Sequence, residues 1–186
     1  MYRLLFVFAA IGLLAHQALA DEDFRILAES GGWAASAHSS SELAPPDVCL
    51  VINFGTGIAF RTDMDGTQLR VLDKSWSLPA DAEGTMSVDI GALHKSFPTR
   101  TATNDMVAAT LTADEIVELL QAMDHTTKMV LTVGNTRPRT VSLVGSTKAT
   151  NAYRTCAGLP GSAAGGGVNP FAPPSTTSGR SSEPEK

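Results

Sequence analysis

The sequence lacks the common signatures of catalysis and of nucleotide binding. It contains no G-x-S-x-G nucleophile motif, no phosphate-binding P-loop, no dinucleotide-binding glycine motif and no H-E-x-x-H zinc motif. Histidine is scarce too: His38, His94 and His125 follow the first twenty residues, and none has a second metal ligand one turn away on a predicted helix. We therefore expect no metal and no cofactor, and these absences favour a non-enzymatic protein.

No apolar run in the sequence is long enough to span a membrane. The run Leu4–Leu14 is much shorter than the helix needed to cross roughly 30 Å of hydrocarbon. Arg3 precedes this run, and residues 18–20 form a small-x-small cleavage pattern, so we interpret residues 1–20 as a secretory signal peptide. We expect the mature chain to be exported to the periplasm or the medium, without a transmembrane segment.

Cysteine is limited to two residues, Cys49 and Cys156. In an oxidising compartment an even number of cysteines favours a disulfide. Cys49 lies in a strongly apolar strand candidate, which disfavours a reactive thiolate there. We predict a disulfide between Cys49 and Cys156 that joins the last element of the fold to its first strong strand. In the chain-entropy description, closing so long a loop stabilises the fold by roughly 4–5 kcal/mol.

Acidic residues are absent from a long carboxyl-terminal stretch. The net charge is −5, yet no Asp or Glu occurs between His125 and Ser182. The acidic total and the expected export disfavour nucleic-acid binding. The asymmetry indicates either a site for an anionic partner or a basic segment that folds against the acidic first half of the chain. The second interpretation requires no external partner.

Two short helices are predicted. Thr112 and Glu115 have the spacing of a capping box, and apolar residues follow on one helical face, so we expect a helix over about residues 112–124. A second helix is expected over about residues 146–157, because Ser146 stands where an N-cap residue belongs. The inner faces are predicted to comprise Ile116, Leu119, Leu120 and Met123 in the first helix, and Ala149, Ala152, Tyr153 and Cys156 in the second.

Alternating apolar residues predict many strands. The strongest signal covers residues 47–62, and Asp65-Gly66 is typical of a hairpin turn. We expect an α+β fold that is mostly antiparallel β, either sandwich-like or a curved sheet, with the two short helices. The remaining strand candidates are residues 68–72, 85–90, 95–103, 106–111, 128–133 and 139–144.

By composition the chain divides into four parts. The signal peptide is followed by a lead-in over residues 21–46, with a short strand near Trp33. Residues 47–158 are expected to form a single globular domain. Residues 159–186 are rich in Gly, Pro and Ser, and because they cannot bury enough apolar surface to offset the entropy of ordering, we predict a disordered tail.

The last two strand candidates predict a hairpin with a definite register. A three-residue loop places Leu131 opposite Arg139 and keeps the apolar side chains of both strands on one face. Pro138 has no N–H to donate, so the second strand should lie at an edge of the sheet. The same register puts Arg137 and Arg139 at the hairpin tip, and with Lys128 they are our candidate contact for a partner.

Tryptophan is the other candidate for a role in binding. Trp76 lies in a loop that Pro79 closes, and it is expected to fill the core beneath that loop. The sequence leaves open whether Trp33 and Trp76 line a ligand cavity or only fill the core.

Several generic packing segments follow one another in a fixed order. They are, in order, Cys49-Leu-Val-Ile-Asn-Phe54, Trp76-Ser-Leu-Pro79, Val88-Asp-Ile90, Leu119-Leu120 and Val141-Ser-Leu-Val-Gly-Ser146. This succession resembles small exported proteobacterial domains of unassigned function and is distantly similar to the invasion-associated locus B proteins. The resemblance implies an envelope-located, β-rich domain, and it carries over no catalytic site.

Three classes of function remain after the sequence is considered. We expect an exported, non-enzymatic envelope protein that binds another protein or an anionic envelope component through Arg137, Arg139 and Lys128. The alternative is a small periplasmic hydrolase or hydrolase inhibitor, which a cleft with His94 or His125 within about 3 Å of a Ser or Asp would favour. A third possibility is a structural module of an envelope assembly.

Overall fold

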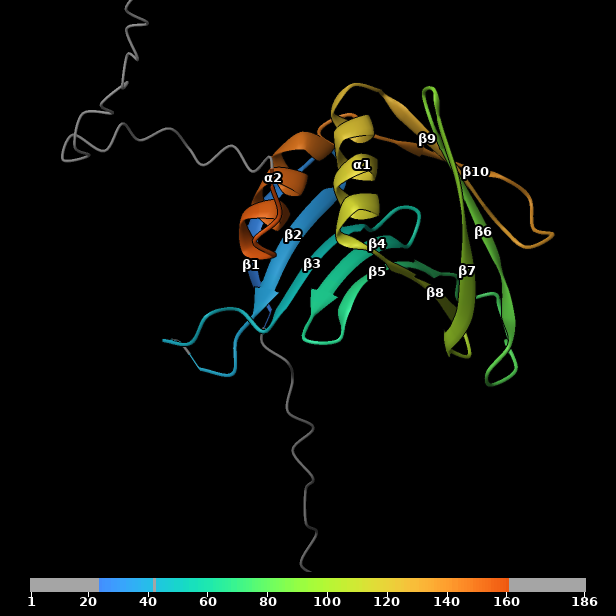
Figure 1. Cartoon of the computed structure of the whole chain (residues 1–186), viewed down its shortest axis with the longest axis horizontal. Coiled ribbons are helices and arrows are strands. Elements are labelled where there is room, and N and C mark those ends of the chain that lie inside the picture. Colours follow the sequence, from blue (N-terminus) through green and yellow to red (C-terminus); the bar gives the residue numbers. More distant parts are fainter. Residues whose placement is uncertain (1–23, 42, 161–186) are drawn as a thin grey trace, which may run out of the picture.

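The computed structural model describes residues 24–41 and 43–160. The predicted signal peptide and the predicted tail beyond residue 160 lie outside the described residues. The described chain forms ten strands and two helices (Figure 1). The strands are β1 (Arg25–Ser30), β2 (Trp33–His38), β3 (Val48–Asn53), β4 (Ile58–Asp63), β5 (Gly66–Leu72), β6 (Glu83–Ile90), β7 (Leu93–Thr103), β8 (Met106–Leu111), β9 (Lys128–Val133) and β10 (Arg139–Ser142), and the helices are α1 (Ala113–Asp124) and α2 (Ser146–Cys156).

All ten strands belong to one antiparallel sheet. Their order is β1-β2-β3-β4-β5-β8-β7-β6-β9-β10, and every neighbouring pair is antiparallel. The predicted α+β class with mostly antiparallel strands is confirmed. Of the two architectures that the sequence left open, the structure forms the curved sheet (Figure 1).

The sheet curves so strongly that elements near its two edges touch. The indole Nε1–H of Trp33 on β2 donates to the carbonyl oxygen of Ser142 on β10, at 2.9 Å. The β1–β2 turn also packs against the segment before α2, where a Cβ on Gly31 would overlap the carbonyl oxygen of Val144. The apolar core and both helices lie inside this curve, because the buried side chains of both halves of the sheet face the same interior.

The segment expected to be a lead-in contributes two strands of the sheet. β1 and β2 pair through a tight turn at Gly31 and Gly32, whose φ angles are 60° and 81°. Only glycine adopts such angles without strain, and a two-residue turn of this kind matches the twist of the flanking strands. The Gly-Gly pair therefore forms a hairpin, and the first strand begins at Arg25. The short strand predicted near Trp33 is β2.

Helix α1 forms as the sequence predicts. The Thr112 hydroxyl accepts from the backbone N–H of Glu115, and the Glu115 carboxylate accepts from the backbone N–H of Thr112, which confirms the capping box. The predicted inner face is fully buried, and each such side chain stabilises the fold by about 1.5–3 kcal/mol. These residues are Ile116, Leu119, Leu120 and Met123.

Helix α2 begins differently from the prediction. Its N-cap is Gly145 in the left-handed conformation, and no side chain caps the first turn. Ser146 is instead the first helical residue and is fully buried. Gly145 lies so close to the backbone of Gly31 that a Cβ would sit 2.9 Å from it. Packing between these two glycines therefore sets the start of the helix, and the predicted capping role of Ser146 was wrong.

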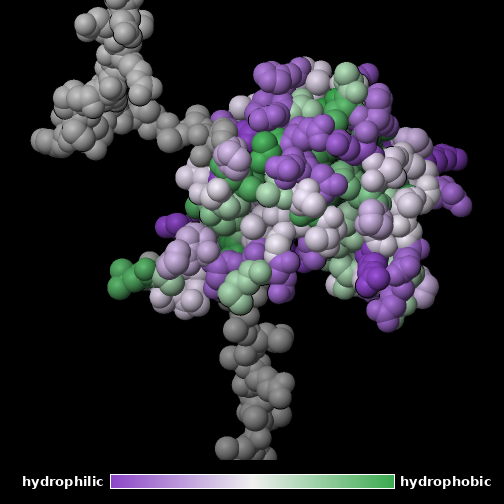
Figure 2. All heavy atoms as spheres, viewed as in Figure 1, coloured by the Kyte–Doolittle hydropathy of each residue, from purple (hydrophilic) through white to green (hydrophobic). Residues whose placement is uncertain are grey.

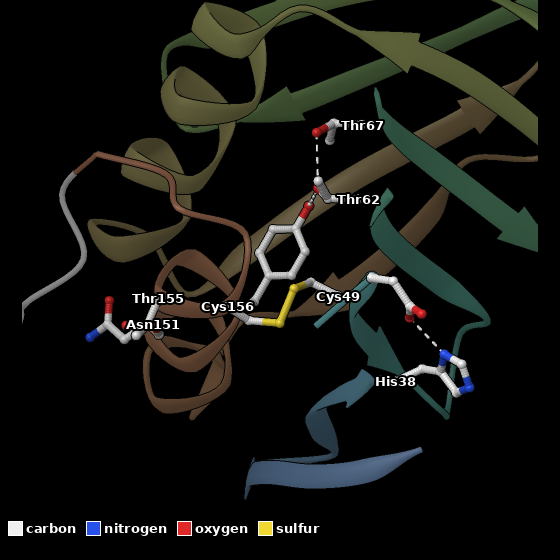
Figure 3. The surroundings of a disulfide bond; sticks show 9 residues. His38, Cys49, Thr62, Thr67, Asn151, Thr155 and Cys156 are labelled. Atoms are coloured by element: carbon white, nitrogen blue, oxygen red, sulfur yellow. Dashed lines mark hydrogen bonds and ion pairs between the residues drawn. A yellow bond between two sulfur atoms is a disulfide. The ribbon is translucent and has the colours of Figure 1, made fainter. Parts of the chain in front are cut away.

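A disulfide fixes α2 to the sheet. Cys49 on β3 and Cys156 on α2 are bonded, with Cα atoms 5.8 Å apart, which confirms the prediction (Figure 3). Beside it, the buried phenol of Tyr153 hydrogen-bonds the Thr62 hydroxyl at 2.6 Å, and burial raises the pKa of Tyr153 to about 12. Arg154 adds an ion pair to α1. Three independent contacts thus hold the last element in place.

The helices present polar outer sides. Figure 2 shows hydrophilic residues over the upper turns of the helices, with apolar residues visible between them. Within the described ranges, neither helix is long and apolar enough to cross a membrane.

Candidate functional site

The β9–β10 hairpin has the predicted register. Arg139 pairs with Leu131 and Val141 pairs with Met129, which keeps Met129, Leu131 and Val141 in the core. β10 is the last strand of the sheet, as the position of Pro138 predicts. The turn between the two strands therefore projects from a well-defined edge of the fold.

The structure does not bring the three predicted contact residues together. Arg137 is exposed in the β9–β10 turn, and Arg139 begins β10 directly after it. Lys128 begins β9, where it pairs with Ser142 at the other end of the hairpin. A six-residue strand extends about 17 Å, so Lys128 is too distant to act with the two arginines.

Arg139 reaches back across the end of the sheet instead of pointing into solvent. Its guanidinium pairs with the Asp73 carboxylate, and its Nη1–H donates to the carbonyl oxygen of Thr56 at 3.5 Å. The same guanidinium lies over the Trp76 ring, with Cζ 5.0 Å from the ring centroid. Arg139 thus ties the β10 edge to the loops that follow β3 and β5.

Asp73 is held in its charged state by several donors. The Ser75 hydroxyl and backbone N–H donate to it at 2.6 and 2.9 Å, and together with Arg139 they lower the pKa of Asp73. The charge of Arg139 is therefore balanced by a carboxylate that stays ionised at neutral pH. Trp76 follows in the same turn, where its backbone N–H donates to the Asp73 carbonyl oxygen at 2.9 Å.

Trp76 forms one wall of a pocket between the β5–β6 loop, the strands β6 to β9 and the β9–β10 turn, which we call the mouth pocket. This mouth pocket has a volume of about 310 Å³ and is mainly apolar. The loop after β5 supplies Trp76 and Leu78, while β8 and β9 supply Val107 and Val133. The rim is polar and uncharged for most of its length, formed by threonines of β6 and β7 and by residues 134–136 of the β9–β10 turn.

Backbone hydrogen bonds hold both sides of the mouth pocket in place. The N–H of Leu78 donates to the carbonyl oxygen of Asn104 at 2.7 Å, which ties the loop to the β7–β8 turn. The N–H of Gly134 donates to the carbonyl oxygen of Thr85 at 2.8 Å, which ties the β9–β10 turn to β6. The pocket is therefore formed before any ligand enters, which lowers the entropy lost on binding.

The structure resolves the question of the two tryptophans. Trp33 is 1% exposed and fills the core. Trp76 is half-buried, packs against the core and lines the mouth pocket. It therefore does more than fill the core beneath its loop. No local pattern reveals this pocket in the sequence, because its walls come from four strands and two connections.

The described histidines, His38, His94 and His125, come from separate parts of the fold. His94 Nδ1 lies 2.7 Å from the Asp89 carboxylate, but the two are cross-strand neighbours with 71% and 46% exposed side chains. His38 pairs with Asp47 at 2.6 Å at the base of the β2–β3 loop. Within residues 24–41 and 43–160, no serine, threonine or cysteine hydrogen-bonds a histidine, and no group of three His, Cys, Asp or Glu side chains is placed to hold a metal.

Fold and pocket together define a β-rich domain with a small, preformed apolar pocket. The chain matches no known protein family, no curated protein and no solved structure.

Proposed function

We propose that this chain is a non-enzymatic binding domain that works in the cell envelope and accepts an apolar side chain of a partner protein in its mouth pocket. The observation that carries the proposal is the pocket itself, with Trp76 held at its wall by Arg139. At about 310 Å³ the pocket is at the small end of ligand sites, so it suits one or two side chains better than a large cofactor.

The geometry favours a protein partner over an anionic envelope component at this end of the sheet. Asp73 balances the charge of Arg139, so this guanidinium does not offer a free site for an anion. Arg139 supports the pocket wall, while the exposed Arg137 beside the rim is the residue available to a partner. An apolar pocket with a polar rim is the usual anatomy of an interaction hot spot.

One exposed apolar residue extends this end of the molecule. Phe54 is 67% exposed in the β3–β4 turn, which also supplies the Thr56 carbonyl to Arg139. A large apolar side chain left in water beside the Arg139 anchor favours a contact surface.

An envelope location is supported by three further features. The disulfide suits an oxidising compartment. The signal-peptide pattern of residues 1–20 and the resemblance to exported proteobacterial domains favour the same location.

Site-specific photo-crosslinking in the native host tests the proposal. A photoreactive amino acid at Asn135, on the pocket rim, should give a discrete adduct. The control carries the same group at Ala92, which is exposed in the β6–β7 turn. This turn lies at the end of the β6–β7 hairpin away from the mouth pocket, so the control should give no adduct.

Two matched substitutions then separate the pocket from its surroundings. Thr136→Trp places a bulky ring at the rim without removing a core contact, and should reduce the Asn135 adduct by about tenfold or more. Thr140→Trp adds the same ring on the exposed side of β10 and should leave the adduct unchanged. An adduct that persists in Thr136→Trp, or equal adducts from Ala92, would contradict the assignment of the pocket.

A further inference from the structure

The outer face of the sheet carries three arginines on neighbouring strands. Leu69 and Val71 of β5 point into the core, so the alternating Arg70 points to the outer face. Arg70 lies opposite Ala108 of β8, and Ala108 lies opposite Arg100 of β7. The two arginines therefore flank one small residue, two strand spacings or about 10 Å apart.

The third arginine lies on β4 beside the first two. Arg61 pairs in register with Gln68, which lies two residues before Arg70 on β5. Arg61 therefore points to the same outer face as Arg70. Arg61 forms an ion pair with Asp63, and Arg100 forms one with Glu83 at 2.9 Å. Two of the three guanidinium groups therefore have a carboxylate partner.

Arg70 is the exception. It is half-buried, and its Nε–H and Nη2–H donate to the amide oxygen of Gln68 at 2.8 and 2.6 Å. Among residues 24–41 and 43–160 no carboxylate forms an ion pair with it. Burial, and then the nearby charge of Arg61, lower the pKa of Arg70. A partly desolvated cation that only a neutral amide satisfies gains strongly from an anion.

A hollow lies where such an anion would have to sit. It has a volume of about 550 Å³, and its lining is as polar as it is apolar. Ala108 leaves the space between the flanking arginines, while Gln68, Arg100 and Thr110 line the hollow with hydrogen-bonding groups. The Glu83 carboxylate also lines it and is paired with Arg100. Arg70 does not line the hollow but lies beside it, because it hydrogen-bonds Gln68 and pairs in register with Ala108.

We infer that this outer hollow of β5, β8 and β7 is an oxyanion site that takes a phosphate group, with Arg70 as its main cation. Arg100 is the second cation, and because its pair with Glu83 is exposed (79% and 68%), that pair can open for a ligand. Phosphate suits two guanidinium groups that approach from either side, since its oxygens accept several charge-assisted hydrogen bonds. The hollow adjoins the mouth pocket, because Glu83, Gly84, Thr99 and Thr101 line both. Neither Arg70 nor Arg100 lines the mouth pocket, so the inference goes beyond the proposed function.

Titration of the exported chain with inorganic phosphate at low ionic strength tests this inference. The arginine Nε–H signals are followed by NMR, and those of Arg70 and Arg100 should shift and saturate together. Arg70→Gln should weaken phosphate binding by about tenfold, the factor expected for one charge-assisted hydrogen bond. Arg100→Gln, at an exposed position that is safe for the fold, should weaken it less.

Lys148→Gln is the matched control, since it removes one exposed positive charge from α2. It should leave the phosphate affinity unchanged. Absence of a saturating shift at Arg70, or equal losses in Arg70→Gln and Lys148→Gln, would overturn the inference.

A second arm identifies the source of the phosphate. Vesicles of phosphatidylglycerol should sediment with the wild-type protein but not with Arg70→Gln if a lipid headgroup is the ligand, and vesicles of phosphatidylcholine serve as the control. Saturable phosphate shifts without such sedimentation assign the site to a soluble phosphate ester. Neither result depends on the Asn135 crosslink, so failure here is distinguishable from failure of the mouth pocket.

Discussion

Reduction of the Cys49–Cys156 disulfide should lower the free energy of unfolding by about 4–5 kcal/mol. The cysteines are 107 residues apart, and the loop-closure expression gives about 4.8 kcal/mol at 25 °C for a loop of that length. Two contacts of α2 survive reduction, the Tyr153–Thr62 hydrogen bond and the ion pair of Arg154. The sheet should therefore stay folded at 25 °C, with a melting temperature lowered by roughly 10–20 °C.

Urea unfolding followed by circular dichroism, with and without a phosphine reductant, measures the difference. Reduction of the wild-type chain compares two states that differ only in the bond. The Cys49→Ala/Cys156→Ala double variant is the control, and its stability should not respond to the reductant. A loss below about 1 kcal/mol on reduction would refute the view that this bond carries much of the stability.

Three further changes test the packing. Burial raises the pKa of Tyr153 to about 12, whereas the pKa of tyrosine in the unfolded chain is about 10. The neutral phenol therefore contributes its full stability below a pH of about 10, and this stability should be lost as the pH rises through 12. The absorbance of tyrosinate reports the ionisation directly, since residues 21–186 contain no other tyrosine. Arg139→Leu should lower the melting temperature by roughly 5 °C or more in thermal unfolding, whereas Arg137→Leu should change it by less than about 2 °C. Gly31→Ala should cost about 2–4 kcal/mol more than Gly134→Ala in urea unfolding, because both glycines have positive φ but only the first meets backbone atoms; equal losses would show that strain alone matters.

Local signals in the sequence were sufficient to predict several features of the fold. The capping box that begins at Thr112 and the apolar period after it determine α1 almost alone. The β9–β10 register follows because a two-residue loop would put Met129 and Leu131 on the opposite face from Val141. The disulfide could be predicted because only one pairing of two cysteines exists.

Features that depend on distant contacts could not be predicted. Gly145 caps α2 because it packs against Gly31, more than a hundred residues away, and no local rule gives that contact. The position of Arg139 at the hairpin tip followed from the register, but its contacts with Asp73 and Trp76 depend on the curvature of the whole sheet. β1 is different, since the Gly31-Gly32 pair that joins it to β2 is a hairpin signal that can be read from the sequence alone.

The most direct test of the mouth pocket is an NMR titration with N-acetyl-leucine amide, which carries one apolar side chain and no charge. Burial of that side chain is worth roughly 2–3 kcal/mol, which corresponds to a Kd of about 10 mM. We predict that the indole N–H of Trp76 and the methyl groups of Leu78 and Val133 shift and saturate at one common concentration, while the buried indole of Trp33 does not move. Shifts that never saturate, or that are as large at Trp33 as at Trp76, would contradict the proposal.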